Sequence, residues 1–229
     1  MHRLPKLFCF FLLLLPATVI AESGKETNAG LSLSYEAEKN LIRELNWSIE
    51  EEIRLVTNAT GFDRSSTTTG LDYAFWKKRM KIGAYYTFLY RYNNKFLYEP
   101  RHRYYFNLSL RETLGNFTLS WRGRVQSTYR QENRGQYKIN PKYVMKNKFE
   151  VEYSVWGRPW KPFVSCDLST ELNNPMGNDL TRIRTEAGAT HRINRTNYIT
   201  FFFRWDEYLV DFDSHPRLLA LGVAYRMKF

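Results

Sequence analysis

The sequence predicts an all-β protein: a transmembrane antiparallel up-and-down β-barrel of about ten strands, with about twelve as the alternative. Three observations predict it. Apolar and polar residues alternate along most of the 229-residue chain, the connections alternate between long and short, and aromatic residues make up 17% of the composition. A period of two places successive side chains on opposite faces of a strand. A closed barrel can cross a bilayer on such strands because it satisfies every backbone hydrogen bond.

The last strand carries the clearest alternation. Apolar residues stand at every second position from Leu219, and the residues between them are charged or small. A chain that ends on an aromatic residue after such a strand resembles bacterial outer-membrane barrel proteins. In those proteins the terminal strand is the signal that the barrel-insertion machinery reads. The residues that match this signal are Val223, Tyr225, Met227 and Phe229. The alternative is an ordinary C-terminal strand of a soluble β domain.

The N-terminus reads as a cleaved secretory signal peptide, residues 1–21. Arg3 and Lys6 give it a basic start, an apolar run follows, and Val19-Ile20-Ala21 offers the small-residue pattern of a cleavage site after Ala21. The protein is therefore expected to be exported. Removal of this segment leaves Cys166 as the single cysteine, so no intramolecular disulfide is expected.

The alternation divides the mature chain into two parts. Residues 44–229 are predicted to form the outer-membrane barrel domain. Residues 30–38 also alternate, with Leu31, Leu33 and Tyr35 in the apolar row. A further spanning strand there would give an odd total, whereas bacterial barrels have even strand numbers. We therefore interpret residues 22–43 as a short periplasmic or partial-strand segment.

The connections support the barrel interpretation. Short turns are expected at 76–79, 112–115, 157–160 and 194–197, and longer polar loops at 57–67, 93–99, 131–140, 173–179 and 211–215. In outer-membrane barrels the short turns face the periplasm and the long loops face outward. This assignment places the C-terminus on the periplasmic side.

Charged residues occupy the face opposite the apolar rows and are expected to line the lumen. An Arg or Lys directed into lipid near the midplane costs about 2–4 kcal/mol, so this orientation is strongly favoured. We expect a lumen charge network of Arg54, Arg101, Arg103, Arg122, Arg124, Glu150, Glu152, Asp167, Glu171, Arg182, Arg184, Glu186, Arg204 and Asp206. The first hypothesis is a structural or binding barrel whose lumen is largely filled by ion pairs. The second is a small pore that favours anions, because the lumen row is rich in Arg and Lys.

Other function classes receive little support. His102 and His191 fall on the apolar row and His215 in a loop, and no catalytic or phosphate-loop motif is present. We therefore expect no enzyme activity, with an outer-membrane lipid enzyme as the least favoured alternative, and no cofactor or metal. The net charge of +11 is distributed at strand spacing rather than clustered, which does not favour nucleic acid. Outer-membrane lipid and lipopolysaccharide are the expected partners of a monomer. An exported, soluble, lipocalin-like barrel holding an apolar ligand is a further alternative.

Four segments carry a family resemblance: 47–54 (WSIEEEIR), 101–103 (RHR), 121–124 (WRGR) and 225–229 (YRMKF). With these segments the chain resembles the outer-membrane family called domain of unknown function 2490 over nearly its whole mature length. The resemblance implies a barrel of about this size in a Gram-negative outer membrane. It implies no activity and no functional residues.

Overall fold

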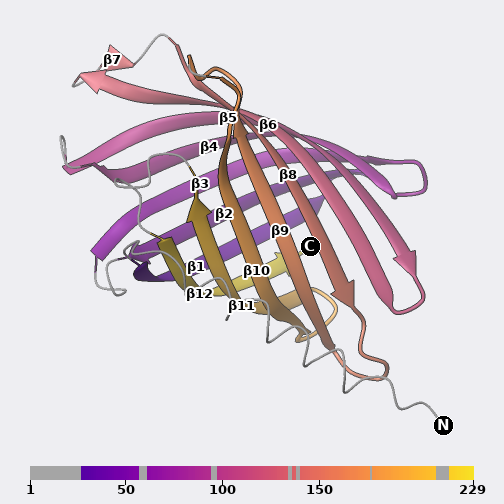
Figure 1. Cartoon of the computed structure of the whole chain (residues 1–229). Helices are drawn as coiled ribbons and strands as arrows, with labels where there is room; N and C mark the ends of the chain where they lie inside the picture. The colour runs from indigo at the N-terminus through magenta and orange to yellow at the C-terminus, as the bar shows by residue number, and fades with distance from the viewer. Residues whose placement is uncertain are drawn as a thin grey trace.

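In the computed structural model of the chain, residues 27–56, 61–93, 97–133, 136–137, 140–175, 177–209 and 217–229 are described. The predicted signal peptide and its cleavage site after Ala21 lie outside these residues, as does His215. The described part of the chain is strand and turn almost throughout (Figure 1). No helix in it has the length and apolarity that a membrane span requires.

The strands are β1 (Thr27–Asn40), β2 (Leu45–Val56), β3 (Gly61–Phe75), β4 (Met80–Asn93), β5 (Leu97–Leu114), β6 (Phe117–Asn133), β7 (Gln136–Tyr137), β8 (Lys142–Tyr153), β9 (Trp160–Glu171), β10 (Leu180–Arg192), β11 (Asn197–Tyr208) and β12 (Arg217–Lys228). The strands are hydrogen-bonded in the order β5-β4-β3-β2-β1-β12-β11-β10-β9-β8-β6. Because β5 also pairs with β6, the two ends of this sheet meet and it closes into a barrel. The short β7 pairs with β6 alone, which leaves eleven strands in the wall. The predicted all-β barrel is confirmed.

The first strand corrects the predicted strand count and the predicted domain boundary. β1 is a full strand of 14 residues, not a partial one, and the barrel begins at Thr27 rather than at residue 44. It pairs antiparallel with β2 and parallel with β12, with Thr27 opposite Arg217 and Glu38 opposite Lys228. The wall therefore has neither ten nor twelve strands, and it is antiparallel everywhere except at this one seam.

The parallel pairing of β1 and β12 fixes at which end of the barrel each of these two strands begins and ends. Because β1 and β12 run in the same direction, β1 ends beside the C-terminus, where the Phe229 N–H donates to the Glu38 carbonyl at 2.8 Å. The start of β1 lies beside the start of β12, at the opposite end of the barrel. We refer to these as the C-terminal end, which carries the short turns, and the loop end.

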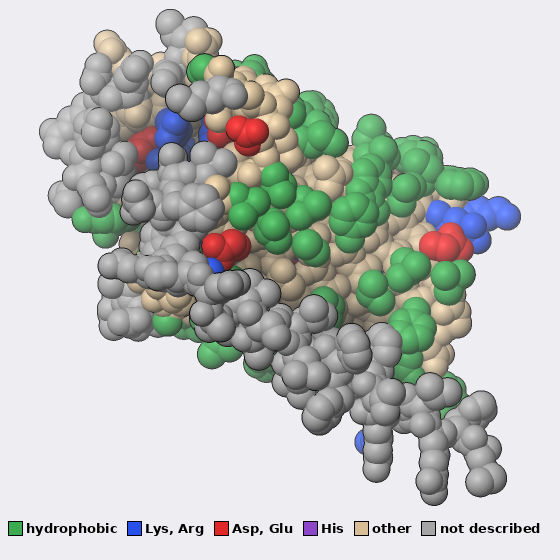
Figure 2. Space-filling view, viewed as in Figure 1, with side chains coloured by type: hydrophobic (Ala, Val, Ile, Leu, Met, Phe, Trp, Pro, Cys, Tyr) green, Lys and Arg blue, Asp and Glu red, His purple; other side chains and the backbone are tan. Residues whose placement is uncertain are grey.

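Side chains alternate between the two faces of the wall. The outward rows hold large exposed apolar residues such as Leu33, Phe106 and Leu221, and Figure 2 shows hydrophobic side chains spread over the visible wall. The inward rows hold charged, small and a few aromatic residues. The Tyr85 ring lies over Gly70 and Gly83, where an added Cβ would meet the ring. The lumen is therefore largely polar, and the Tyr85 ring occupies the space that these two glycines leave free.

Several strands extend further toward the loop end than the sequence predicts. β3 begins at Gly61, so most of the predicted loop 57–67 is strand, and β5 begins at Leu97 within the predicted loop 93–99. Similarly, β6 continues through Asn133. At the C-terminal end the hairpins are tight, and Gly115 has a φ of 60° in the turn between β5 and β6. Glycine adopts this left-handed conformation without the strain of a Cβ.

Candidate functional site in the lumen

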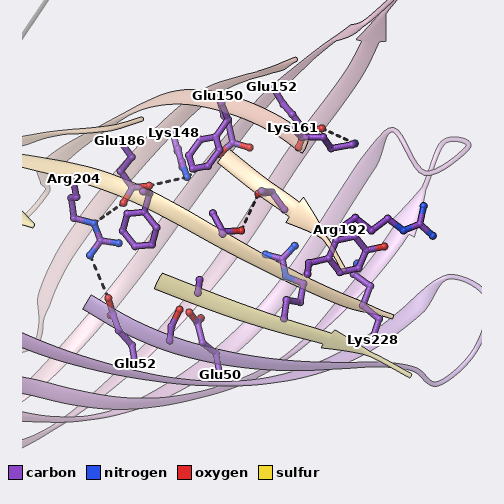
Figure 3. Close-up of a pocket in the computed structure, with 18 of the residues that line it drawn as sticks. Glu50, Glu52, Lys148, Glu150, Glu152, Lys161, Glu186, Arg192, Arg204 and Lys228 are labelled. Carbon is purple, nitrogen blue, oxygen red and sulfur yellow. Dashed lines mark hydrogen bonds and ion pairs between the residues drawn. The ribbon is translucent and has the colours of Figure 1, made fainter. Parts of the chain in front are cut away.

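A chain of ion pairs crosses the barrel at mid-height. The Arg204 guanidinium contacts the Glu52 carboxylate at 3.3 Å and the Glu186 carboxylate at 2.6 Å. Lys148 Nζ lies 3.4 Å from Glu186 and 3.0 Å from Glu150. We call Glu52, Arg204, Glu186 and Lys148 the ion-pair band; Figure 3 shows these four side chains reaching toward one another. The band connects β2, β11, β10 and β8.

The inward rows of β1 and β12 explain how the band forms. Glu52 and Arg204 lie on β2 and β11, which are separated by these two strands. At this level β1 and β12 present only small residues, including Ser32 and Gly222, so the long side chains meet above them. Ser32 Oγ also donates to Glu52 at 2.9 Å, and Arg54 Nη2 donates to it at 2.9 Å. Glu52 is thus held by three donors from three strands.

Further pairs line the wall around the band. Arg184 donates two hydrogen bonds to Asp206, at 2.5 and 2.8 Å, and Asp206 is completely buried. Arg101 forms a similar two-bond pair with Glu99, at 3.1 and 3.0 Å. Paired geometry of this kind is what a buried carboxylate needs to remain charged. The lumen wall is therefore braced by ion pairs over much of its height.

The structure brings nine residues of the predicted network into ion pairs: Arg54, Arg101, Glu150, Glu152, Glu171, Arg184, Glu186, Arg204 and Asp206. Within the described residues it shows no ion pair for the other five, which are Arg103, Arg122, Arg124, Asp167 and Arg182. These five still lie on inward rows. The predicted network is therefore divided into a paired set and a set without ion pairs.

Sequence reasoning missed several of the acidic partners, of which Glu99 and Glu36 are two examples. Glu99 pairs with Arg101 but was assigned to a loop, and Glu36 pairs with Arg226 at 2.5 Å but was assigned to the N-terminal segment. Glu36 alternates with Tyr35 and Ala37, so strand parity alone places it on the inward face. Once β1 is recognised as a full strand, that signal is sufficient.

A cavity of about 580 Å³ occupies the lumen between the ion-pair band and the C-terminal end (Figure 3). Its lining includes Glu50, Glu152, Lys161, Arg192 and Lys228. Glu152 accepts from Lys161 at 3.0 Å and from Arg111 at 3.3 Å. The cavity is thus lined by both signs of charge and ends at the band.

The four residues of the predicted insertion signal lie on the last strand and its end. Tyr225 stacks on Tyr35 of β1, and its hydroxyl donates to Asn197 Oδ1 at 2.8 Å. Val223 and Met227 share its outward row, and Phe229 is 63% exposed. The described residues contain no group of three or more His, Cys, Asp or Glu side chains that could hold a metal ion.

The comparisons place the chain in a family. Residues 30–208 match the profile of the family described as Protein of unknown function (DUF2490), and the chain belongs to this family. Among solved structures, the chain is similar to the β domain of the Bordetella autotransporter BrkA, at 9% identity and a TM-score of 0.45. That similarity covers 82% of this chain and 85% of the other. Curated proteins give no match.

Proposed function

We propose that the protein is a bacterial outer-membrane β-barrel with a structural or binding role, whose lumen is closed to solutes at mid-height. The observation that carries the proposal is the ion-pair band, because side chains from β2, β8, β10 and β11 meet across the lumen. An eleven-stranded wall lies nearer the filled eight-stranded barrels than the water-filled barrels of sixteen strands. The band accordingly acts as an internal brace rather than as the lining of an open channel.

The outer face supports the membrane location. Large apolar side chains project from the outward rows around the barrel, as lipid contact requires, and few charges interrupt them. Insertion would use the terminal strand as its signal, read by the barrel-insertion machinery. Outer-membrane lipid and lipopolysaccharide are the proposed partners of a monomer. No cofactor, nucleic acid or catalytic activity is part of the proposal.

Heat-modifiable migration tests the location and the fold together. Isolated outer membranes are solubilised without heating, and the protein is followed on a gel beside a boiled sample. The folded barrel should migrate differently from the boiled chain and should fractionate with the outer membrane. Recovery of the processed chain as a monomer in detergent-free buffer would instead support the soluble, ligand-holding barrel.

Conductance tests whether the lumen is closed. The purified barrel, reconstituted in a planar bilayer, should show no steady openings while the band is intact. A small pore that favours anions is the second candidate. The cavity of about 580 Å³ favours it, as do the inward Arg residues for which the described part of the chain shows no ion pair. Steady openings with anion preference would replace the first proposal by this one.

A further inference from the structure

A group of cations lies in the lumen on the loop side of the ion-pair band. Arg103 on β5, Arg124 on β6, Lys146 on β8 and Arg182 on β10 all belong to inward rows; we call them the basic cluster. On β8, Lys148 of the ion-pair band follows Lys146 by two positions. On β10, Glu186 of the band follows Arg182 by four positions. The charges are therefore segregated along the barrel axis.

The four cations lie close together on the lumen face of one part of the wall, because β5, β6, β8, β9 and β10 are successive strands. Arg103 is within electrostatic range of Arg64, Arg124 and Arg182, and Lys146 is within range of Arg182, Arg103 and Arg124. Register supports this arrangement, because Lys146 is opposite Arg124 on one side and opposite Ser169 on the other, and Ser169 is opposite Arg182. Four strands thus deliver like charges to one place.

The hydrogen bonds that the structure shows for the cluster use neutral partners. Arg103 donates to Thr128 Oγ1 at 3.2 Å, Arg124 to Asn107 Oδ1 at 2.9 Å, and Arg182 to Ser169 Oγ at 3.2 Å. Arg124 also lies over the Tyr105 ring, 3.9 Å from its centroid. Within the described residues, no carboxylate forms an ion pair with any of the four.

Donor groups in this region also remain unused. Arg182 Nε is buried and lacks a hydrogen-bond partner within the described residues. The same holds for Nε and Nη1 of Arg54, which is only 2% exposed. Arg54 lies within electrostatic range of Arg64. The carboxylates that face the cluster are Asp167, which accepts from Ser169 at 3.2 Å, and Asp206, which is held by Arg184. Arg54 and Arg64 have carboxylate partners of their own, Glu52 at 2.9 Å and Asp63 at 2.6 Å. Asp167 and Asp206 are therefore left to balance the four cations of the basic cluster, and Asp206 is already paired with Arg184.

We propose that the basic cluster is a binding site for a small tetrahedral oxyanion of the phosphate or sulfate type. Guanidinium groups present paired N–H donors that match two oxygens of such an anion, and a lysine adds a point charge. An oxyanion among Arg103, Arg124, Lys146 and Arg182 would relieve their mutual repulsion and satisfy idle donors. The inference rests on the proposed function, because it requires these side chains to face an enclosed lumen.

The test is anion-dependent stability of the full mature chain, folded in detergent micelles. Thermal unfolding is followed at constant ionic strength while inorganic phosphate or sulfate replaces chloride. A saturable rise in Tm is expected with phosphate or sulfate and not with chloride. A rise that follows ionic strength alone, or no rise at all, would overturn the proposal.

Two variants on one strand provide the matched comparison. Arg182→Gln removes a cluster cation, whereas Arg192→Gln removes an inward cation at the C-terminal end of the same strand, where it donates to the Asn194 carbonyl. Arg182→Gln should weaken the apparent phosphate affinity about tenfold or more, because it removes a charge-assisted contact, and Arg192→Gln should leave it unchanged. Equal losses in the two variants would identify general charge screening and contradict the site.

Folding of the variants is controlled within the same experiment. Arg182→Gln relieves repulsion among the cations, so in chloride its Tm should equal or exceed that of the unmodified protein. Heat-modifiable migration then confirms that each sample is a folded barrel. A folded, heat-modifiable barrel without a phosphate effect refutes the anion site alone, whereas loss of heat-modifiable behaviour in the unmodified protein refutes the proposed function.

Discussion

Tyr35 of β1 and Tyr225 of β12 stack across the parallel seam that closes the barrel, with ring centroids 5.8 Å apart and planes inclined by 10°. The two residues are opposite one another in the strand register. Tyr225 belongs to the predicted insertion signal, so the residue that would mark the terminal strand for assembly also contacts the first strand. The contact that closes the barrel and the proposed insertion signal thus share Tyr225.

This contact predicts a measurable coupling between the two rings. Aromatic pairs contribute about 0.5–1.5 kcal/mol beyond the area that they bury. A double-mutant cycle of Tyr35→Ala and Tyr225→Ala should give a coupling of about this size in urea unfolding from lipid vesicles. The pair Tyr35→Ala and Tyr153→Ala is the control, because these residues lie on separate strands without contact. Additive effects in the first pair would show that the seam does not form.

Arg204 should be among the most sensitive residues in the lumen. It bridges Glu52 and Glu186, and its side chain is only 10% exposed. Arg204→Gln removes the cation that two carboxylates share. Because Glu52 keeps Arg54 and Glu186 keeps Lys148, the loss of stability should be at or below the about 3–5 kcal/mol that breaking a buried pair costs. Urea unfolding should show a loss of that order, whereas Arg192→Gln at the C-terminal end should change stability little. Equal losses would mean that the band does not brace the barrel.

Phe203 and Thr200 test the assignment of the two faces. Phe203 lies on an outward row of β11, and Thr200 on the inward row of the same strand, where it lines the cavity. Phe203→Arg directs a charge into lipid, at a cost of about 2–4 kcal/mol near the midplane. Assembly yield in the outer membrane should fall sharply for Phe203→Arg and less for Thr200→Arg. Similar yields for the two variants would show that the outward face of Phe203 and the inward face of Thr200 are wrongly assigned.

Gly222 is required because the Phe202 ring occupies the space above it. A Cβ at Gly222 would overlap that ring. Gly222→Val should destabilise the barrel by about 1–3 kcal/mol, the usual cost of overpacking. Ala224→Val, two residues further along the inward row and beside the cavity, is the matched control and should be tolerated. Replacing the ring by the smaller side chain of leucine, in Phe202→Leu, should restore the stability lost in Gly222→Val. If stability is not restored, this packing is contradicted.

Much of the wall could be predicted from sequence because a strand fixes the face of each side chain locally. The period of two assigns Arg204 and Glu186 to the lumen and Phe203 to lipid without any knowledge of pairing. Which charges meet cannot be read in this way, since Arg204 and Glu52 are 152 positions apart. Their contact depends on the register and on how β1 and β12 are inserted between them.

The errors at the N-terminus and in the loops have different physical causes. The alternation around Tyr35 is a genuine strand signal, but it was outweighed by the rule of even strand numbers. That rule assumes antiparallel closure, whereas β1 closes the barrel in parallel. In β3, the outward positions Ser65, Thr67 and Thr69 are polar, so the segment lacks the apolar row that identifies a lipid-facing strand. Thr67 donates instead to Glu51 at 2.5 Å, which explains the one charge in the outward row of β2.

The most direct test of the central claim, that the chain closes into an eleven-stranded barrel through β1 and β12, is disulfide cross-linking in the outer membrane. Leu33 lies opposite Val223 across the seam and opposite Ile53 on the other side. In a Cys166→Ser background, Leu33→Cys with Val223→Cys should cross-link under a lipid-soluble oxidant, whereas Ile53→Cys with Val223→Cys should not, because β1 separates those strands. Cross-linking of the second pair without the first would place β2 directly against β12 and contradict the account.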